Sequence, residues 1–129
     1  MRSYNQIFGT FGEDEAVKHL EKKRYKILKR NYKNKFGEID IIAEKKGEIS
    51  FFEVKTRKSD KFGKPYEAVN LNKQRKIVLC AKHFLSQNNL FEKNVHFDVI
   101  EVYGSFDGSF FVFEKLNHIK DAIDQISQF

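Results

Sequence analysis

The sequence is poor in the residues that cross-link, kink or ligate. It has one cysteine, one proline, one methionine and no tryptophan among 129 residues. The single cysteine, Cys80, excludes an internal disulfide and a cysteine-based zinc site, and its place on an apolar helical stripe indicates a core position. The four histidines are scattered, with no His-x-x-x-His pair. We therefore expect each histidine to be a surface or core residue and not a metal ligand.

Long apolar runs and nucleotide-binding signatures are also missing. No apolar run exceeds five residues (Ile77 to Ala81), so the sequence predicts no membrane span. Residues 1–5 lack the apolar segment of a secretory signal, and we expect a cytoplasmic protein. The sequence has no Walker loop and no glycine-rich dinucleotide fingerprint. These absences argue against membrane proteins, P-loop NTPases and dinucleotide-dependent enzymes.

Apolar, aromatic and basic residues are plentiful. The apolar fraction is 40% and the aromatic fraction 15%, and 14 residues are phenylalanine, which supports a packed core. The length predicts one domain over residues 1–129, without a linker or internal repeat. The formal net charge of +6 favours a polyanionic partner such as nucleic acid. Proteins of the ribosomal neighbourhood or of a membrane surface share that bias.

Two β-branched runs in the first half of the chain predict a hairpin. Residues 39–43 and 49–54 are separated by a polar break that contains Gly47. A turn centred between Lys46 and Gly47 would pair position 45 with 48, 42 with 51, and 40 with 53. Asp40 and Glu53 would then face each other, with Cβ atoms about 5 Å apart. A three-residue loop would instead place them on opposite faces.

A facing pair of carboxylates needs a cation, because like charges directly opposite are destabilising. Lys55 lies one pleat further along the same face and is one candidate; a divalent metal is the other. Mg²⁺ takes one or two protein carboxylates, keeps waters and binds phosphate oxygens. A metal there would activate a water, and the lysine could hold that water or a phosphate oxygen. The pattern therefore predicts a phosphodiester-cleaving site; the alternative is a solvated hairpin face with one salt bridge.

Residues 3–23 predict a helix that carries a further acid. Glu13 lies on the same stripe as Val17, so it would face the core. It could be a third acid of the site, or an acid that compensates the helix dipole if a helical segment begins just before it. Gly9 and Gly12 indicate close approach of the backbone to another element or to a phosphate.

A basic segment follows the second strand of the hairpin. Residues 56–70 predict the longest irregular segment. Its positive charges could follow a DNA backbone, or it could be a solvent-exposed connection that happens to be basic. The basic residues are Lys55, Arg57, Lys58, Lys61 and Lys64. A helix from Asn70 or Asn72 to about residue 87 comes next, and its Gln74 could touch the substrate or be a satisfied buried amide.

The remaining segments complete a predicted α/β or α+β domain. Strands are expected at 25–32, 95–103 and 110–113, and a short C-terminal helix is expected around Ile119 to Ile126. We assign Asp98, within the 95–103 strand, a structural role. The order α-β-β-β-α-β-β-α predicts three layers, with a central mixed sheet of about five strands flanked by helices.

Three motifs resemble those of a known family. They are Gly37-Glu38-Ile39-Asp40-Ile41-Ile42-Ala43, then Phe52-Glu53-Val54-Lys55-Thr56-Arg57, then Phe62-Gly63-x-Pro65-x-Glu67-Ala68-Val69. The chain resembles the YraN-type family of small bacterial proteins, from the first helix into the strand at 96–100. That family is assigned to the restriction-endonuclease-like, PD-(D/E)xK, superfamily, close to the archaeal Holliday-junction resolvases. The resemblance implies a restriction-endonuclease-like fold.

The resemblance also implies roles for individual residues. Metal ligands would be Asp40 and Glu53, the catalytic lysine Lys55, and the helix-borne acid of the resolvase branch Glu13. The proline that usually precedes the first aspartate is Ile39 here. Residues expected to contact nucleic acid are Arg57, Lys58, Lys61, Lys64, Lys73 and Gln74.

The implied activity is that of an endonuclease dependent on Mg²⁺ or Mn²⁺ and acting on DNA, including branched DNA. Junction resolution needs two active sites, so that activity would require a homodimer. Two alternatives remain at this point. One is a nucleic-acid-binding module with the fold but no turnover, and the other is an adaptor whose acidic cluster is structural.

Overall fold

The computed structural model describes residues 3–58 and 71–123, apart from the side chain of Asn5. The order of elements follows the prediction as far as the fifth strand. The elements are α1 (Tyr4–Lys22), β1 (Lys26–Asn34), β2 (Gly37–Lys45), β3 (Glu48–Lys58), α2 (Leu71–Gln87), β4 (Val95–Asp107) and β5 (Phe110–Ile119).

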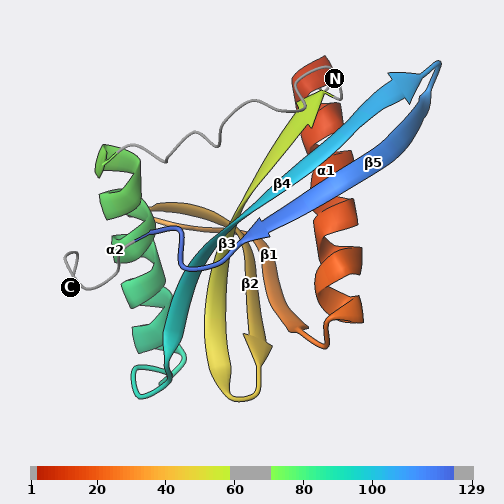
Figure 1. Cartoon of the computed structure of the whole chain (residues 1–129). Helices are drawn as coiled ribbons and strands as arrows, with labels where there is room; N and C mark the ends of the chain where they lie inside the picture. The colour runs from red at the N-terminus through yellow and green to blue at the C-terminus, as the bar shows by residue number, and fades with distance from the viewer. Residues whose placement is uncertain (1–2, 59–70, 124–129) are drawn as a thin grey trace.

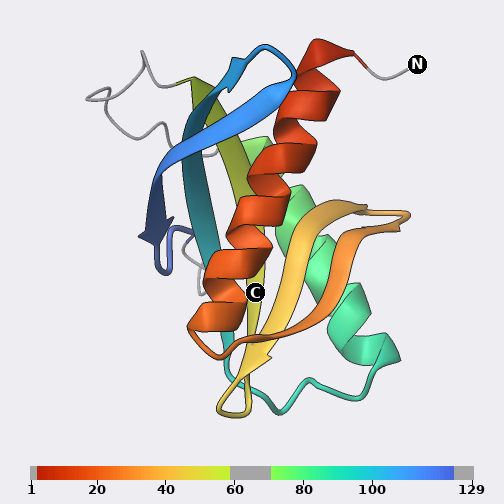
Figure 2. The same ribbon diagram turned by 90° about the vertical axis from the view of Figure 1, so that its right-hand side faces the viewer.

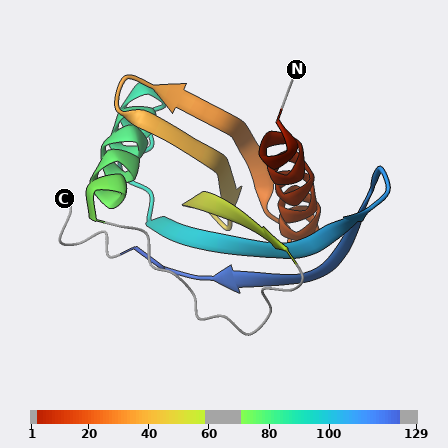
Figure 3. The same ribbon diagram turned by 90° about the horizontal axis from the view of Figure 1, so that it is seen from above.

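The five strands form one mixed sheet between two helices. Their order in the sheet is β1-β2-β3-β4-β5. Only β3 and β4 are parallel, and the other neighbours are antiparallel. A parallel pair needs a crossover connection, which contains α2. The helices lie on opposite faces of the sheet, α1 in front and α2 behind in Figure 2, as Figures 1 and 3 also show. The predicted α+β class with a helix-flanked mixed sheet is confirmed.

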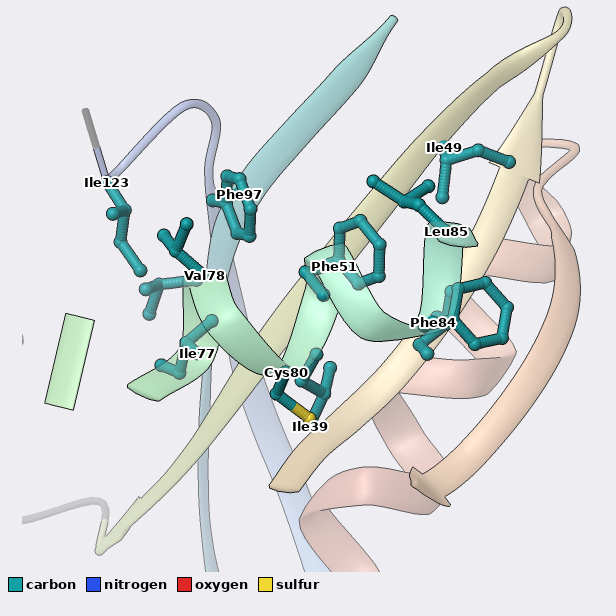
Figure 4. Packing of buried hydrophobic residues seen from close by; sticks show 13 residues of the cluster. Ile39, Ile49, Phe51, Ile77, Val78, Cys80, Phe84, Leu85, Phe97 and Ile123 are labelled. Atoms are coloured by element: carbon teal, nitrogen blue, oxygen red, sulfur yellow. The ribbon is translucent and has the colours of Figure 1, made fainter. Parts of the chain in front are cut away.

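The core on the α2 side is built from the helical stripe that the sequence predicts. Ile77, Val78, Ala81, Phe84 and Leu85 are all buried. They meet aromatic residues of the sheet (Figure 4), where the rings of Phe51 and Phe97 stack with centroids 5.3 Å apart. Cys80 lies in the same cluster, and burial raises the pKa of its thiol to about 11. It is thus a core residue, as predicted.

The α1 side has its own core, and strand alternation fixes which side chains join it. Phe52 packs there with Leu20 of α1, whereas Phe51 packs on the α2 side. Successive side chains of a strand point to opposite faces. Glu53 and Lys55 therefore share the α2 side of the sheet, as far as β3 stays regular. This alternation decides where the candidate site lies.

Three boundaries differ from the prediction. Residues 56–58 continue β3, because they pair with β4 as far as Lys58 and Gly104. β4 and β5 continue past the end of β3 as a two-stranded hairpin (Figure 1). β5 then runs as far as Ile119. The predicted C-terminal helix is therefore wrong at its start, since Ile119 pairs with Val99 in the sheet. Ile123 is buried on the α2 side, and residues 124–129 lie outside the described part.

Asp98 has the surroundings of a structural residue. It is buried, its Oδ2 lies 2.7 Å from Nε2 of His118, and its Oδ1 accepts a hydrogen bond from the backbone N–H of Asp121. These contacts tie β4 to β5 and to the segment after it. Among the helices of the described residues, none is long and apolar enough to cross a membrane.

Candidate active site

Asp40 lies where β2 separates from β3. Pairing between these strands begins at Lys45–Glu48, includes Ile42–Phe51, and ends at Ile41–Phe52. The predicted register is thus confirmed over the hairpin, but the predicted pair between positions 40 and 53 does not form. There the Asp40 side chain, in place of a backbone carbonyl of β2, accepts from β3: its Oδ2 lies 2.8 Å from the backbone N–H of Val54, which donates the hydrogen bond.

Side-chain alternation along β2 is also interrupted at Asp40. Ile39 and Ile42 both pack on the α2 side, although they are three residues apart, and Ile41 packs on the α1 side. The neighbouring strand is irregular at the same level, because Asn31 of β1 has a φ of 51°. These irregularities place the Asp40 carboxylate at the fork of the sheet instead of on one regular face.

The Asp40 carboxylate is strongly disfavoured as an anion. Burial, and then the negative charge of Glu53, raise its pKa to about 7. Glu13 raises it further, while the Val54 N–H and the Lys73 ammonium lower it. A raised pKa is what the sequence predicted for a close carboxylate pair, although burial is a larger cause than the pairing. Asp40 is therefore a half-buried acid whose surroundings, among the described residues, favour its neutral form.

Lys73 of α2, and not Lys55, is the cation at Glu53. Its Nζ lies 2.5 Å from Oε1 of Glu53. Burial lowers the pKa of Lys73, but the hydrogen bond to Glu53 and the charges of Glu53 and Asp40 outweigh burial, so that pKa is raised. Lys73 thus belongs to the acid cluster itself, which the sequence did not indicate. Gln74, the next residue, is half-buried in the first turns of α2.

Lys55 lies one pleat beyond Glu53 on β3. Its backbone is opposite Glu101 of β4 in the parallel register, and its side chain is half-buried. Among the described residues Lys55 forms no ion pair. The sequence had offered Lys55 as the cation between the two acids. The structure instead places it one pleat from Glu53, with no ion pair to any described acid.

Glu13 approaches the site from the middle of α1. The helix is continuous from Tyr4, so Glu13 is not an N-terminal acid and the helix-dipole interpretation is wrong. Burial raises the pKa of Glu13 even though Arg30, 3.9 Å away, lowers it. The negative charge of Glu13 in turn contributes to the raised pKa of Asp40. The charges of Glu13 on α1 and Glu53 on β3 therefore both act on Asp40 of β2.

The basic residues after Lys55 do not form one continuous track. Arg57 is paired through its Nε with Glu101 at 3.1 Å, and its side chain is only 20% exposed. Lys58 follows on the opposite face, where its Nζ lies 5.5 Å from the ring centroid of Tyr4. Lys61 and Lys64 lie outside the described residues. No sequence pattern predicts Glu101 as the partner of Arg57, because a lone acid in an apolar strand belongs to no motif.

A polar groove adjoins Asp40 on the α1 side. It has a volume of about 420 Å³ and lies between the N-terminal half of α1 and the β1–β2 hairpin. Its lining includes Gln6, Gly9, Thr10, Glu13, Asn31, Lys33, Glu38, Ile39 and Asp40. Lys33 and Glu38 pair with each other at 3.6 Å. The groove thus brings solvent to the acid cluster from the side away from Lys73.

The donor set suits a hard divalent cation that takes few protein ligands. In the described part of the chain, no three carboxylate, histidine or cysteine side chains come close enough to hold a metal together. Mg²⁺ does not require three, because it commonly uses one or two carboxylates and otherwise water and phosphate oxygens. Asp40 and Glu53 would supply such a pair, because the charge of Glu53 acts on Asp40 and raises its pKa after desolvation has done so. The residues therefore fit Mg²⁺ or Mn²⁺.

The fold and the site together define a small α+β domain with an acid cluster at a fork of its sheet. The chain belongs to the family described as uncharacterised protein family UPF0102, which matches residues 12–102. It is similar to a UPF0102 protein of Clostridium perfringens, 46% identical over 122 residues, or 95% of this chain and 98% of that protein. A UPF0102 protein of Caldanaerobacter subterraneus is 47% identical over 114 residues, or 88% and 92%. The family part of the resemblance is thus confirmed.

Proposed function

We propose that this chain is a divalent-metal-dependent phosphodiesterase that hydrolyses DNA, including branched DNA. The observation that carries the proposal is the state of Asp40: a half-buried carboxylate that accepts from the Val54 N–H and whose pKa is raised to about 7 by desolvation and by Glu53. Strongly perturbed acids of this kind concentrate at functional sites. The net charge of +6 supports a polyanionic substrate.

In this proposal each residue has a distinct task. Asp40 and Glu53 would hold the cation, which would supply a water of lowered pKa and neutralise charge on the phosphate. Lys55 offers its ammonium to a non-bridging phosphate oxygen or to the attacking water. The water oxygen bonds to phosphorus, the ester P–O bond breaks, and the proton lost by the water balances the one gained by the leaving oxygen. Glu13 adds negative charge that favours cation binding.

The Lys73–Glu53 pair favours a second candidate function. A lysine that already neutralises Glu53 would suit a domain that keeps the fold and binds nucleic acid without cutting it. In an active enzyme this ammonium must give way when the cation binds, or remain at the edge of the site and contact a phosphate. The two functions therefore differ in whether a divalent cation replaces Lys73 at Glu53.

The experiment is a cleavage assay in Mn²⁺ with single-stranded, duplex and four-way DNA. Wild-type protein should cut at least one substrate, and Glu53→Ala should cut none. Glu92→Gln is a matched control, because Glu92 is an exposed glutamate in the turn before β4. It should cut like the wild type. Binding of these DNAs without cleavage by any protein would overturn the phosphodiesterase in favour of the binding module.

A homodimer is part of the proposal only for four-way junctions. Cutting two strands of a junction symmetrically requires two sites, so the protein should sediment as a dimer under the conditions in which it resolves junctions. A monomer that cuts only one strand per encounter would restrict the activity to simpler substrates.

A further inference from the structure

Gly9 and Gly12 of α1 have different surroundings, and the difference has a functional meaning. A Cβ added at Gly12 would lie 2.0 Å from Oγ1 of Thr56, so packing of α1 on β3 explains that glycine. A Cβ added at Gly9 would meet nothing within 4 Å. Glycine inside a helix lowers stability relative to alanine. Among the residues that the structure describes, no packing contact therefore accounts for Gly9.

Gly9 lies on the wall of the groove that leads to Asp40. A side chain at this position would project into a space of about 420 Å³. That volume falls within the range of about 300–1,000 Å³ typical of small-molecule sites. Since no described side chain fills the space, the bare backbone at Gly9 keeps it open beside the acid cluster.

The chemistry of the groove favours an uncharged, hydrogen-bonding occupant. Gln6 and Asn31 contribute amides and Thr10 a hydroxyl to the groove. Oε1 of Gln6 accepts from the N–H of Ser3, the Thr10 hydroxyl donates to the Gln6 carbonyl, and Asn31 is hydrogen-bonded to Glu13. Because an amide NH₂ carries two hydrogens, the two amides keep donor capacity toward an occupant. Glu13 and Asp40 add their carboxyl groups, and Lys33, the one lysine among the described lining residues, is paired with Glu38 at 3.6 Å. A phosphate inside the groove would be poorly compensated, whereas a base and its sugar carry no charge and expose donors and acceptors.

We propose that this groove binds the base and sugar of an unpaired nucleotide whose phosphate lies at Asp40. The inference rests on the proposed function and deepens it, because it assigns the substrate class. A base inside a duplex cannot enter such a groove without leaving its stack. DNA with a single-stranded tail, flap or unpaired position is therefore the preferred substrate, and fully paired duplex is not.

The test compares three labelled DNAs by fluorescence anisotropy, in Ca²⁺ to keep them intact. They are a fully paired duplex, the duplex with a single-stranded tail of about ten nucleotides, and the same tail built from abasic sites. The wild type should bind the base-bearing tail about tenfold more tightly than the other two. Equal affinity for the base-bearing and abasic tails would overturn the groove as a base site.

Substitutions at Gly9 give the second arm. Gly9→Leu should lose the preference for bases while binding the paired duplex within about twofold of wild type. Gly9→Ala should keep the preference and melt at or above the wild-type temperature, because alanine favours helix and meets no clash. Ser86→Leu adds the same side chain at an exposed site of α2 and should behave like wild type. A Gly9→Leu protein that retains the preference would overturn the inference.

A replacement variant and a separate cleavage assay distinguish failure of the groove from failure of the phosphodiesterase. If melting curves show that Gly9→Leu does not fold, Gly9→Gln replaces it, and the wild-type comparison of the base-bearing and abasic tails still decides. Cleavage in Mn²⁺ is measured separately on the same DNAs. Base-selective binding without cleavage supports the groove and overturns the phosphodiesterase. Cleavage without base selectivity supports the phosphodiesterase and overturns the groove.

Discussion

Asp40 combines two roles that are usually separate. Its carboxylate continues the hydrogen bonding of the sheet by accepting from the N–H of Val54, at the level where β2 leaves β3. The same carboxylate lies near Glu53 and Glu13, whose charges oppose its ionisation. A residue needed only for the hydrogen bond could be asparagine, which would accept the bond without carrying the charge. The charge itself therefore calls for a functional explanation.

Asp40→Asn should remove the cost in stability that the Asp40 charge causes. An acid whose folded-state pKa is raised from 3.8 to about 7 reduces the free energy of unfolding progressively as pH rises through that interval. The cost is complete above pH 7 and is relieved below pH 4. Without divalent metal, Asp40→Asn should thus be more stable than wild type at pH 8, by about 2 kcal/mol, and nearly equal at pH 4. Denaturant unfolding at both pH values measures this, and a variant less stable at pH 8 would contradict it.

Lys55 gives a second prediction at the same scale. Because it forms no ion pair among the described residues, its removal should leave folding nearly unchanged. Lys55→Ala should lower the rate of DNA cleavage by at least about 10²-fold, with melting temperature and DNA affinity close to wild type. Lys55→Arg should not restore the rate, because a planar fork does not replace a compact ammonium. A large loss of stability in Lys55→Ala would show that the lysine is structural.

The acids of the site could be predicted from sequence, but their arrangement could not. Strand periodicity and a two-residue turn bring positions 40 and 53 together, and the register is correct as far as Ile41–Phe52. Beyond that pair, the separation of β2 from β3 depends on contacts with β1 and α1, which no local pattern encodes. The same holds for Lys73, whose ion pair with Glu53 depends on how α2 packs on the sheet.

At the scale of elements, the contact of α1 with β3 positions Glu13 over the fork. The contact is close because Gly12 has no side chain, and Thr56 fills the space where a Cβ would lie. The helix is also held by Leu20, which is fully buried on the α1 side. One substitution at Gly12 should therefore test how α1 is seated.

Gly12→Ala should reduce the free energy of unfolding by about 1–3 kcal/mol, because overpacking outweighs the higher helix propensity of alanine. The substitution Thr56→Ala removes the Oγ1 that the new Cβ would meet and should recover part of that loss. A double-mutant cycle with Gly12→Ala and Thr56→Ala measures the coupling by denaturant unfolding. Additive effects of the two substitutions would mean that α1 shifts freely on the sheet.

Elements with a strong periodic pattern could be predicted with nearly their true bounds. α2, which spans Leu71–Gln87, is the example. The apolar pattern of α1 is weaker, and its start at Tyr4 follows the capping residue Ser3. The ends of β3 and β5 could not be predicted, because they are set by neighbours in the sheet. Residues 56–58 are polar and basic, yet they continue β3 by pairing with β4. Ile119 fits an amphipathic helix in sequence, but pairing with Val99 places it in β5.

For the whole molecule, the net positive charge and the acidic site have to be considered together. A charge of +6 attracts DNA to the protein, whereas the cluster around Asp40 repels a phosphate locally. A divalent cation removes this conflict, because it neutralises the acids and accepts phosphate oxygens. The conflict therefore makes metal binding measurable in the free protein, before any substrate has been identified.

The last prediction uses global stability to detect the metal. A ligand that binds only the folded state stabilises it by about 2.7 kcal/mol at a concentration 100 times its Kd. At pH 6 Asp40, with a pKa of about 7, is mostly protonated, and the metal must displace that proton. Mn²⁺ should thus raise the melting temperature more at pH 8 than at pH 6.

Two variants distinguish a metal site from a general effect of salt. Asp40→Asn and Glu53→Gln should each lose most of the Mn²⁺ shift at pH 8, whereas the exposed-site control Glu92→Gln should keep it. NaCl at matched ionic strength should not reproduce the shift, because screening acts on all surface charges alike. Two results would contradict the metal site: an equal rise in melting temperature with Mn²⁺ in all four proteins, or no rise at either pH. In both cases Lys73 would be the permanent partner of Glu53. The acid cluster would then be a structural feature that binds no metal.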